Sequence, residues 1–200
     1  MQDRNPLYPI FLKLHELRLL IVGAGEVGYE KMSFILKSSP DARITLVAPW
    51  VNPEISSLLK EHPNPKVTIH QRAFEPSDVK GHDLVIAATN IQALNLQVRQ
   101  VAKAEGKLIN VADTPDQCDF YLGSIVTKGN LKVAISTNGQ SPTFAKRFRQ
   151  VLEDILPDDT TQLLNNLKVF RDRLKGDFST KVEELNALTA DLLNRTEIKN

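Results

Sequence analysis

The stretch Gly23-Ala24-Gly25-Glu26-Val27-Gly28 decides the fold of this chain. It follows the mostly apolar run Arg18–Val22, which predicts a short buried strand, and it precedes a stretch to about Lys37 that predicts a helix. A G-x-G-x-x-G placed between a strand and a helix is the fingerprint of a dinucleotide-binding turn. The first glycine permits the tight turn, the second lets the backbone approach a pyrophosphate, and the third lets the helix pack closely on the sheet.

An expected acidic residue is missing further along the chain. The second predicted strand, Arg43–Val47, ends in Ala48-Pro49-Trp50. Most dinucleotide-binding domains place an acid about 20 residues after the glycines, where it holds the ribose hydroxyls. Neither an acid nor an arginine for a 2′-phosphate follows this strand. The sequence therefore predicts an unusual Rossmann domain that prefers NAD to NADP.

Composition and charge exclude several classes of protein. The 200 residues carry a net charge of +1, so nothing global points to nucleic acid or a membrane surface. No apolar run approaches the ~20 residues of a membrane-spanning helix, and the first residues lack the layout of a signal peptide. The single cysteine, Cys118, excludes an intrachain disulfide. We expect a soluble, cytoplasmic protein.

Strands and helices alternate up to residue 112. The remaining strands are predicted at Val67–His70, Leu84–Ala88 and Leu108–Val111, and helices at about 53–60 and 93–104. Alternation of helices with apolar strands predicts an α/β fold whose parallel sheet is covered on both faces.

The pattern changes after Asp113. Residues 123–128 and 131–136 predict a hairpin joined by Gly129-Asn130, and Ser141-Pro142 predicts the start of a helix that runs to about Ile155. From Asp158 on, two amphipathic helices are predicted, separated by Gly176-Asp177. We therefore predict a Rossmann domain over 1–112, a small α+β domain over 113–155 and a helical domain over 156–200.

Ligands of an open parallel sheet bind beyond the carboxyl ends of its strands. Four such ends, at 23–28, 48–50, 89–90 and 112–113, are expected to meet in one crevice. The expected cofactor-binding residues are Gly23, Gly25, Glu26, Val27, Gly28, Pro49, Trp50, Thr89 and Asn90.

Charged residues near this crevice have two interpretations. Asp113 follows the last parallel strand, where a carboxylate would face the nicotinamide and act as a general base, but Asp-Thr-Pro is equally good turn chemistry. Lys146, Arg147 and Arg149 suit an acidic ligand, although a solvated helix face is the commoner case. The four histidines are scattered, and no spacing indicates a preformed metal site.

Several motifs occur together in one order. They are Tyr8–Leu14, the glycine turn, Thr45–Pro49, Ala87–Asn90 with Asn95, Asn110–Asp113, Cys118–Phe120, and Ala134–Thr137 through Gly139–Pro142. Together they resemble the precorrin-2 dehydrogenase family, which also forms the N-terminal module of sirohaem synthase. The resemblance covers roughly residues 6–155 and is weak beyond them.

The resemblance implies oxidation of precorrin-2 to sirohydrochlorin with NAD⁺ bound without an acid after the second strand. It implies that residues 113–155 form a dimerisation domain, that two protomers interlock around the site, and that Asp113 assists proton removal. Precorrin-2 carries eight carboxylates, which basic and polar groups would contact. The expected substrate-binding residues are Ser124, Thr137, Lys146, Arg147 and Arg149.

Some members of the family that the chain resembles also insert Fe²⁺, as sirohydrochlorin ferrochelatases, or Co²⁺ into sirohydrochlorin. Because no metal-ligand set is visible, the sequence favours the dehydrogenase alone. The pathway, sirohaem or cobalamin, stays open. No methyltransferase domain accompanies these motifs, so we expect a separate uroporphyrinogen methyltransferase to supply the substrate.

The family's Gly-Gly pair before Ser141 is Asn138-Gly139 here, a departure that bears on the conformation of this loop. Two other functions compete with the dehydrogenase. One is a non-enzymatic, NAD(H)-sensing regulatory Rossmann domain, against which Ala48-Pro49 argues because such domains place an acid there. The other is a degenerate dehydrogenase that serves only as an assembly partner.

Overall fold

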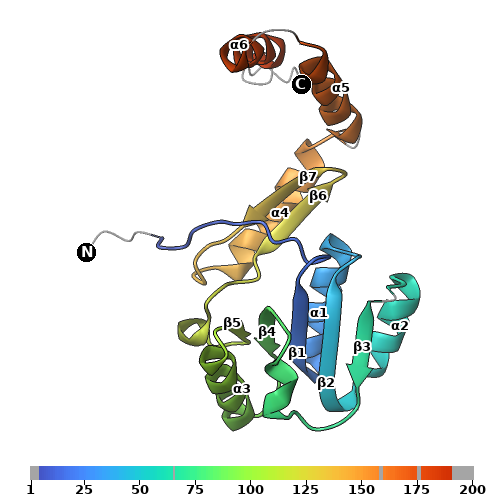
Figure 1. Ribbon diagram of the computed structural model, residues 1–200, viewed down its shortest axis with the longest axis vertical. Helices are drawn as coiled ribbons and strands as arrows, with labels where there is room; N and C mark the ends of the chain where they lie inside the picture. The colour runs from blue at the N-terminus through green and yellow to red at the C-terminus, as the bar shows by residue number, and fades with distance from the viewer. Residues whose placement is uncertain (1–4, 65, 158–159, 175–176, 191–200) are drawn as a thin grey trace. The chain divides into compact units, whose positions relative to one another are not determined.

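The computed structural model describes residues 5–64, 66–157, 160–174 and 177–190 (Figure 1). The chain divides into two compact units. The first runs to residue 123 and takes in 136–142, and the second comprises 124–135 and the chain from residue 143 on. The three-domain division expected from the sequence stays a prediction.

The first unit contains a five-stranded parallel sheet with the order β3-β2-β1-β4-β5. Its strands are β1 (Arg18–Ala24), β2 (Arg43–Val51), β3 (Val67–His70), β4 (Leu84–Ala87) and β5 (Leu108–Val111). The chain winds from β1 outward to β3 and then returns to the other side of β1 with β4. This reversal is the topological switch point at which open α/β sheets bind ligands. The predicted Rossmann-type fold is confirmed.

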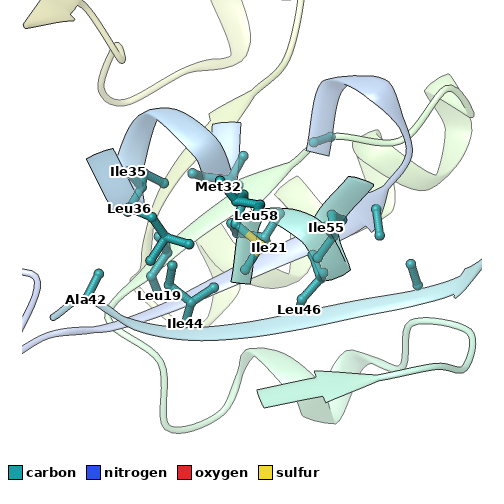
Figure 2. Close-up of a cluster of buried hydrophobic side chains, with 14 of the residues drawn as sticks. Leu19, Ile21, Met32, Ile35, Leu36, Ala42, Ile44, Leu46, Ile55 and Leu58 are labelled. Atoms are coloured by element: carbon teal, nitrogen blue, oxygen red, sulfur yellow. The ribbon is translucent and has the colours of Figure 1, made fainter. Parts of the chain in front are cut away.

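Alternating side chains of the central strands build a core on each face of the sheet. On one face, Leu19 and Ile21 of β1 pack with Met32 of α1 (Glu26–Ser38) and Leu58 of α2 (Pro53–Glu61). Figure 2 shows these side chains gathered between the two helices and the sheet. On the other face, β1 packs through Leu20 with α3 (Gln92–Ala104) and the short 3₁₀ helix η1 (Pro76–Val79). Each fully buried aliphatic side chain contributes about 1.5–3 kcal/mol to folding.

Strand β2 continues beyond its predicted end at Val47. Val22 of β1 pairs with Val47, but Ala24 pairs with Val51, so residues 48–50 bulge opposite Gly23. Pro49 lies in this bulge, where a missing N–H is tolerated. The bulge leaves Trp50 60% exposed beside the glycine turn.

The second unit pairs β6 (Ser124–Lys128) with β7 (Leu131–Ile135) as an antiparallel hairpin. It continues into α4 (Pro142–Ile155), α5 (Thr160–Arg173) and α6 (Phe178–Thr189). The hairpin turn contains Gly129 at φ +55°, and a Cβ at this glycine would overlap the side chain of Thr161. The start of α5 therefore packs directly on the turn. Asp158 and Gly176, expected at the ends of the C-terminal helices, lie outside the described residues.

His82 makes the stability of the first unit depend on pH. Its Nδ1–H donates to the carbonyl of Asp78 (2.8 Å), and its Nε2 lies 2.9 Å from Oγ1 of Thr45. Burial lowers the pKa of His82, although the Asp78 carbonyl opposes that effect. Below the ordinary histidine pKa of about 6.5, the unfolded chain therefore binds a proton that the folded state resists, and stability falls as the pH falls.

We expect the thermal midpoint of the wild type to drop between pH 7.5 and pH 5.5 by more than that of His82→Gln. Thermal unfolding at several pH values measures the difference. His15→Gln is the matched control, because His15 is exposed. An equal drop in wild type and His82→Gln would refute the assignment to His82.

Candidate functional site

The glycine turn presses against the end of β4. Gly23 has φ +105°, a conformation that favours glycine, and a Cβ there would lie 2.5 Å from the carbonyl oxygen of Ala88. A Cβ at Gly28 would overlap the carbonyl of Gly23, so that α1 begins in direct contact with the turn. Both glycines are therefore required by close backbone packing, as the fingerprint predicts.

Gly25 differs from its two neighbours in the fingerprint. Apart from Gly25 itself and its two chain neighbours, no heavy atom of the described residues lies within 4 Å of the place that a Cβ would take at Gly25. Gly25 is also the N-cap of α1, and it offers no side chain to the first N–H groups of that helix. Such N–H groups and the positive end of the helix dipole bind phosphates. The open volume above Gly25 and the α1 N-terminus, with Glu26 and Val27, thus suit a pyrophosphate.

The loop after β4 is held by a buried asparagine. Asn95 of α3 is 7% exposed. Its Oδ1 accepts from the N–H of Thr89 (3.1 Å) and its Nδ2 donates to the Thr89 carbonyl (2.9 Å). The Thr89 hydroxyl lies 2.7 Å from the same Oδ1. The side chain thereby fixes Thr89, while Asn90 lies exposed beside it.

We expect Asn95→Ala to lower stability by about 1–3 kcal/mol, since it removes the partners of the Thr89 backbone. It should also raise the KM for the dinucleotide, because the Thr89 loop loses its support. Thermal unfolding and initial rates measure the two effects. Gln97→Ala, at an exposed position of α3, is the control. If Asn95→Ala had the stability and the KM of the wild type, the Thr89 loop would not depend on Asn95.

The β2 side of the turn carries Pro49 and Trp50, both exposed. Asn52 follows them, buried, and its N–H donates to the carbonyl of Ala24 (2.8 Å). Its Oδ1 accepts from the N–H of Glu54 (2.9 Å) and caps α2. Asn52 therefore fastens the glycine turn to α2, and Trp50 offers an uncharged, exposed ring at this edge of the site.

Asp113 follows β5, the neighbour of β4. It is exposed, with φ +57°, a left-handed conformation that few residues other than glycine adopt. The N–H of Ala112 donates to the carbonyl of Ala87 (2.9 Å), so the turn starts level with the end of β4. The ends of β1, β2, β4 and β5 thus bring the predicted cofactor residues and Asp113 to one edge of the sheet.

The loop of Thr137 belongs to the first unit. Asn138 (φ +53°) and Gly139 (φ +76°) are both left-handed. Asparagine tolerates this conformation, so Asn138 serves where the family carries a glycine. The Oγ1 of Thr137 accepts from the N–H of Ser141 (3.1 Å), which gives the Thr137 hydroxyl a role within the loop itself.

The other predicted substrate residues belong to the second unit. Ser124 is half-buried at the start of β6, and Lys146 and Arg147 are exposed on α4. Arg149 forms an ion pair with Glu153 one turn later, which offsets part of its charge. Their position in a common site with Asp113 stays a prediction.

Neither a metal centre nor a membrane span is found in the part of the chain that the structure describes. Within it, no three histidine, cysteine, aspartate or glutamate side chains gather as a metal site would require. Likewise, none of its helices is long and apolar enough to cross a membrane.

Asn52 and Asn95 are the supporting residues that sequence reasoning did not assign to the site. Both are buried amides whose partners are backbone groups of the loops at the strand ends. For Asn52 the sequence signal was its placement just after the second strand, and for Asn95 it was its occurrence with the motif Ala87–Asn90, to which no supporting role was assigned.

Two consecutive segments of the chain match models of known protein families. Residues 10–124 match the family model described as "Putative NAD(P)-binding", and residues 128–155 match "Sirohaem biosynthesis protein central". A solved structure titled "SirC, precorrin-2 dehydrogenase" is similar, with a TM-score of 0.72 and 26% identity. The match covers 96% of this chain and 94% of that one.

Curated relatives include two named "Siroheme synthase". The chain is 37% identical over 173 residues to the protein of Pseudoalteromonas atlantica, which is 86% of this chain and 36% of that one. It is 34% identical over 170 residues to the protein of Nitrosomonas europaea, which is 85% of this chain and 35% of that one. The chain thus spans about a third of the length of the curated relatives it matches.

Proposed function

The chain belongs to the family that joins an NAD(P)-binding domain to the central domain of sirohaem biosynthesis proteins, and we propose that it oxidises precorrin-2 to sirohydrochlorin with NAD⁺. The observation that carries the proposal is the arrangement at one edge of the sheet. There, the open Gly25 turn and Asp113 extend from strands on either side of β4, which carries the Thr89 loop. The similarity to a precorrin-2 dehydrogenase over nearly the whole chain supports the same assignment.

Different cofactor residues would bind different parts of the dinucleotide. Gly25 and the first N–H groups of α1 would hold the pyrophosphate, since space and unpaired donors coincide there. The neutral ring of Trp50 would lie against the adenine half, and the Thr89 loop against the nicotinamide half. The lack of a phosphate-binding arginine after β2 favours NAD⁺ over NADP⁺.

The reaction removes two electrons and two protons from the substrate. When bound, NAD⁺ supplies the acceptor for the hydride. Asp113 would take the remaining proton as a general base, because its exposed carboxylate lies at the edge of the sheet where the nicotinamide is expected. Ser124, Thr137, Lys146, Arg147 and Arg149 would contact the substrate's carboxylates. We propose the dehydrogenase activity alone, without metal insertion.

The proposed enzyme acts as a homodimer through α4. Phe144, Phe148, Val151 and Ile155 recur at helical spacing on one face, and each is 42–66% exposed in the single chain. The rings of Phe144 and Phe148 are stacked, with centroids 5.9 Å apart. A monomer rarely exposes such a continuous apolar stripe, and a second copy would cover it.

We expect Val151→Glu to shift the protein from two chains to one, because a carboxylate buried between two such stripes lacks a partner. Light scattering after gel filtration measures the mass. Gln150→Glu adds the same charge beside the stripe and should leave the mass unchanged. A Val151→Glu variant that stays dimeric would place the interface elsewhere.

The function is tested anaerobically with purified protein, enzymatically generated precorrin-2 and NAD⁺. We expect the absorbance of sirohydrochlorin to appear only when protein and NAD⁺ are both present. A second reaction with Fe²⁺ or Co²⁺ should show metal insertion no faster than the protein-free control. A folded protein that binds NAD⁺ but forms no sirohydrochlorin would overturn the proposal in favour of a sensor or an assembly partner.

A further inference from the structure

We propose that Cys118 is a positioning residue for Asp113: its thiol binds both backbone groups of Val111 and so holds the loop that carries Asp113 in its left-handed conformation. The proposal rests on the proposed function, in which Asp113 takes the proton. Cys118 itself is not proposed to contact cofactor or substrate.

The thiol bonds to the backbone of Val111 as a neighbouring strand would. The N–H of Val111 donates to Sγ of Cys118 (3.2 Å), and Sγ lies 3.2 Å from the Val111 carbonyl oxygen, to which it donates in return. Sγ also lies 3.4 Å from the carbonyl of Thr114. One side chain thus joins the last residue of β5 to the far end of the loop, and Asp113 lies between these two ends.

The loop needs the contacts of the thiol because Asp113, which is not a glycine, has a left-handed backbone. A left-handed backbone costs an ordinary residue roughly 1–2 kcal/mol, and less for aspartate. Thr114 contributes one weak backbone bond, from its N–H to the Val111 carbonyl (3.3 Å). The same carbonyl is the acceptor of the Cys118 thiol, so two of the bonds at this turn converge on Val111. The Thr114 hydroxyl adds a third bond, to the carbonyl of Ala112 (3.3 Å).

The thiol is suited to this role by its burial. Cys118 packs against the apolar core on the α3 face of the sheet, and this burial raises the pKa of its thiol. The S–H group is therefore retained at neutral pH and remains a donor. A serine would offer a donor of similar kind but a shorter bond from Cβ.

Other contacts anchor the neighbouring chain without the thiol. Asn110 donates through Nδ2 to the carbonyl of Phe120 (2.8 Å), and Asp119 accepts from the N–H of Ile109 (3.1 Å) and from Lys103 (2.7 Å). Arg99 also donates to the carbonyl of Gln117 within the loop (3.2 Å). Removal of the thiol is therefore expected to loosen the turn at Asp113, while the later part of the loop and the segment after it stay attached.

The experiment compares Cys118→Ala and Cys118→Ser with wild type by NMR and by kinetics. In Cys118→Ala, we expect the backbone shifts and couplings of Asp113 to lose their left-handed signature. The kcat should fall about 10- to 100-fold, as for a displaced catalytic group, with the KM for NAD⁺ unchanged. Cys118→Ser should recover part of both. Val79→Ala, in the same core but on η1, should lower stability and leave kcat unchanged.

The outcomes separate the positioning role from a merely structural one. A left-handed Asp113 in Cys118→Ala, or an unchanged kcat, would overturn the proposal. In an Asp113→Asn background, Cys118→Ala should reduce kcat no further, since it acts through Asp113, and an additional loss would also overturn it. An inactive wild type would refute the proposed function instead, and NMR would then decide whether the thiol holds the loop.

Discussion

Asp113→Asn is expected to lower kcat by about 10²- to 10⁴-fold, the contribution of a general base. Asparagine has the shape of aspartate and tolerates the left-handed backbone at φ +57°, so the loop should keep its conformation. Its amide, however, accepts no proton from the substrate. The KM for NAD⁺ and the thermal midpoint should stay at their wild-type values, because Asp113 does not support the glycine turn.

Steady-state rates over a range of pH check this expectation. The kcat of Asp113→Asn should stay low at every pH at which the wild type is active. Asp116→Asn is the matched control, because Asp116 is an exposed carboxylate in the same loop. If Asp113→Asn kept its kcat within twofold of wild type, Asp113 would be a turn residue and the base would lie elsewhere.

Gly25→Ala is expected to weaken NAD⁺ binding without loss of stability, whereas Gly28→Ala is expected to destabilise the first unit. The Cβ at position 25 meets open space, so Gly25→Ala should fold with wild-type stability, yet its methyl group enters the volume proposed for the pyrophosphate. A steric cost of about 1–3 kcal/mol corresponds to roughly a 5- to 150-fold weaker affinity for NAD⁺. The Cβ at position 28 overlaps the Gly23 carbonyl, so Gly28→Ala should destabilise the first unit by a similar energy.

Calorimetric titration with NAD⁺ and thermal unfolding of both variants distinguish these effects. Gly106→Ala at the end of α3 is a control for Gly25→Ala, since it too meets open space but lies away from the cofactor turn. Its left-handed backbone (φ +66°) should cost stability, but it should leave NAD⁺ affinity unchanged. If Gly25→Ala bound NAD⁺ as tightly as wild type, the pyrophosphate would not lie above this glycine.

Local sequence patterns suffice for most of the fold. Val67–His70 and Leu108–Val111 form strands with the predicted bounds, because each is a short apolar or β-branched run between turns. The extension of β2 through Pro49 and Trp50 could not be predicted in this way. It depends on Gly23 of a different strand, opposite which the bulge forms.

In the candidate site, only the features that belong to a known sequence motif could be predicted. The close backbone packing at Gly23 and Gly28 follows from a fingerprint with known geometry and is found in the structure, whereas cofactor binding by these glycines stays a prediction. The contacts of Asn95 and Cys118 depend on loops that meet in space, so neither could be derived from sequence spacing. The left-handed backbone at Asn138 is also a property of its loop, although asparagine is among the residues that permit it.

The side chains that seal β5 also protect the protein from aggregation. An outer strand with free N–H groups recruits strands of other molecules, which pair with it edge to edge. Here, the outward N–H groups of Ile109 and Val111 are already bound, by the Asp119 carboxylate and the Cys118 sulfur. A foreign strand would find neither donor available, so the outer side of β5 should resist edge-to-edge pairing without a further strand to cover it.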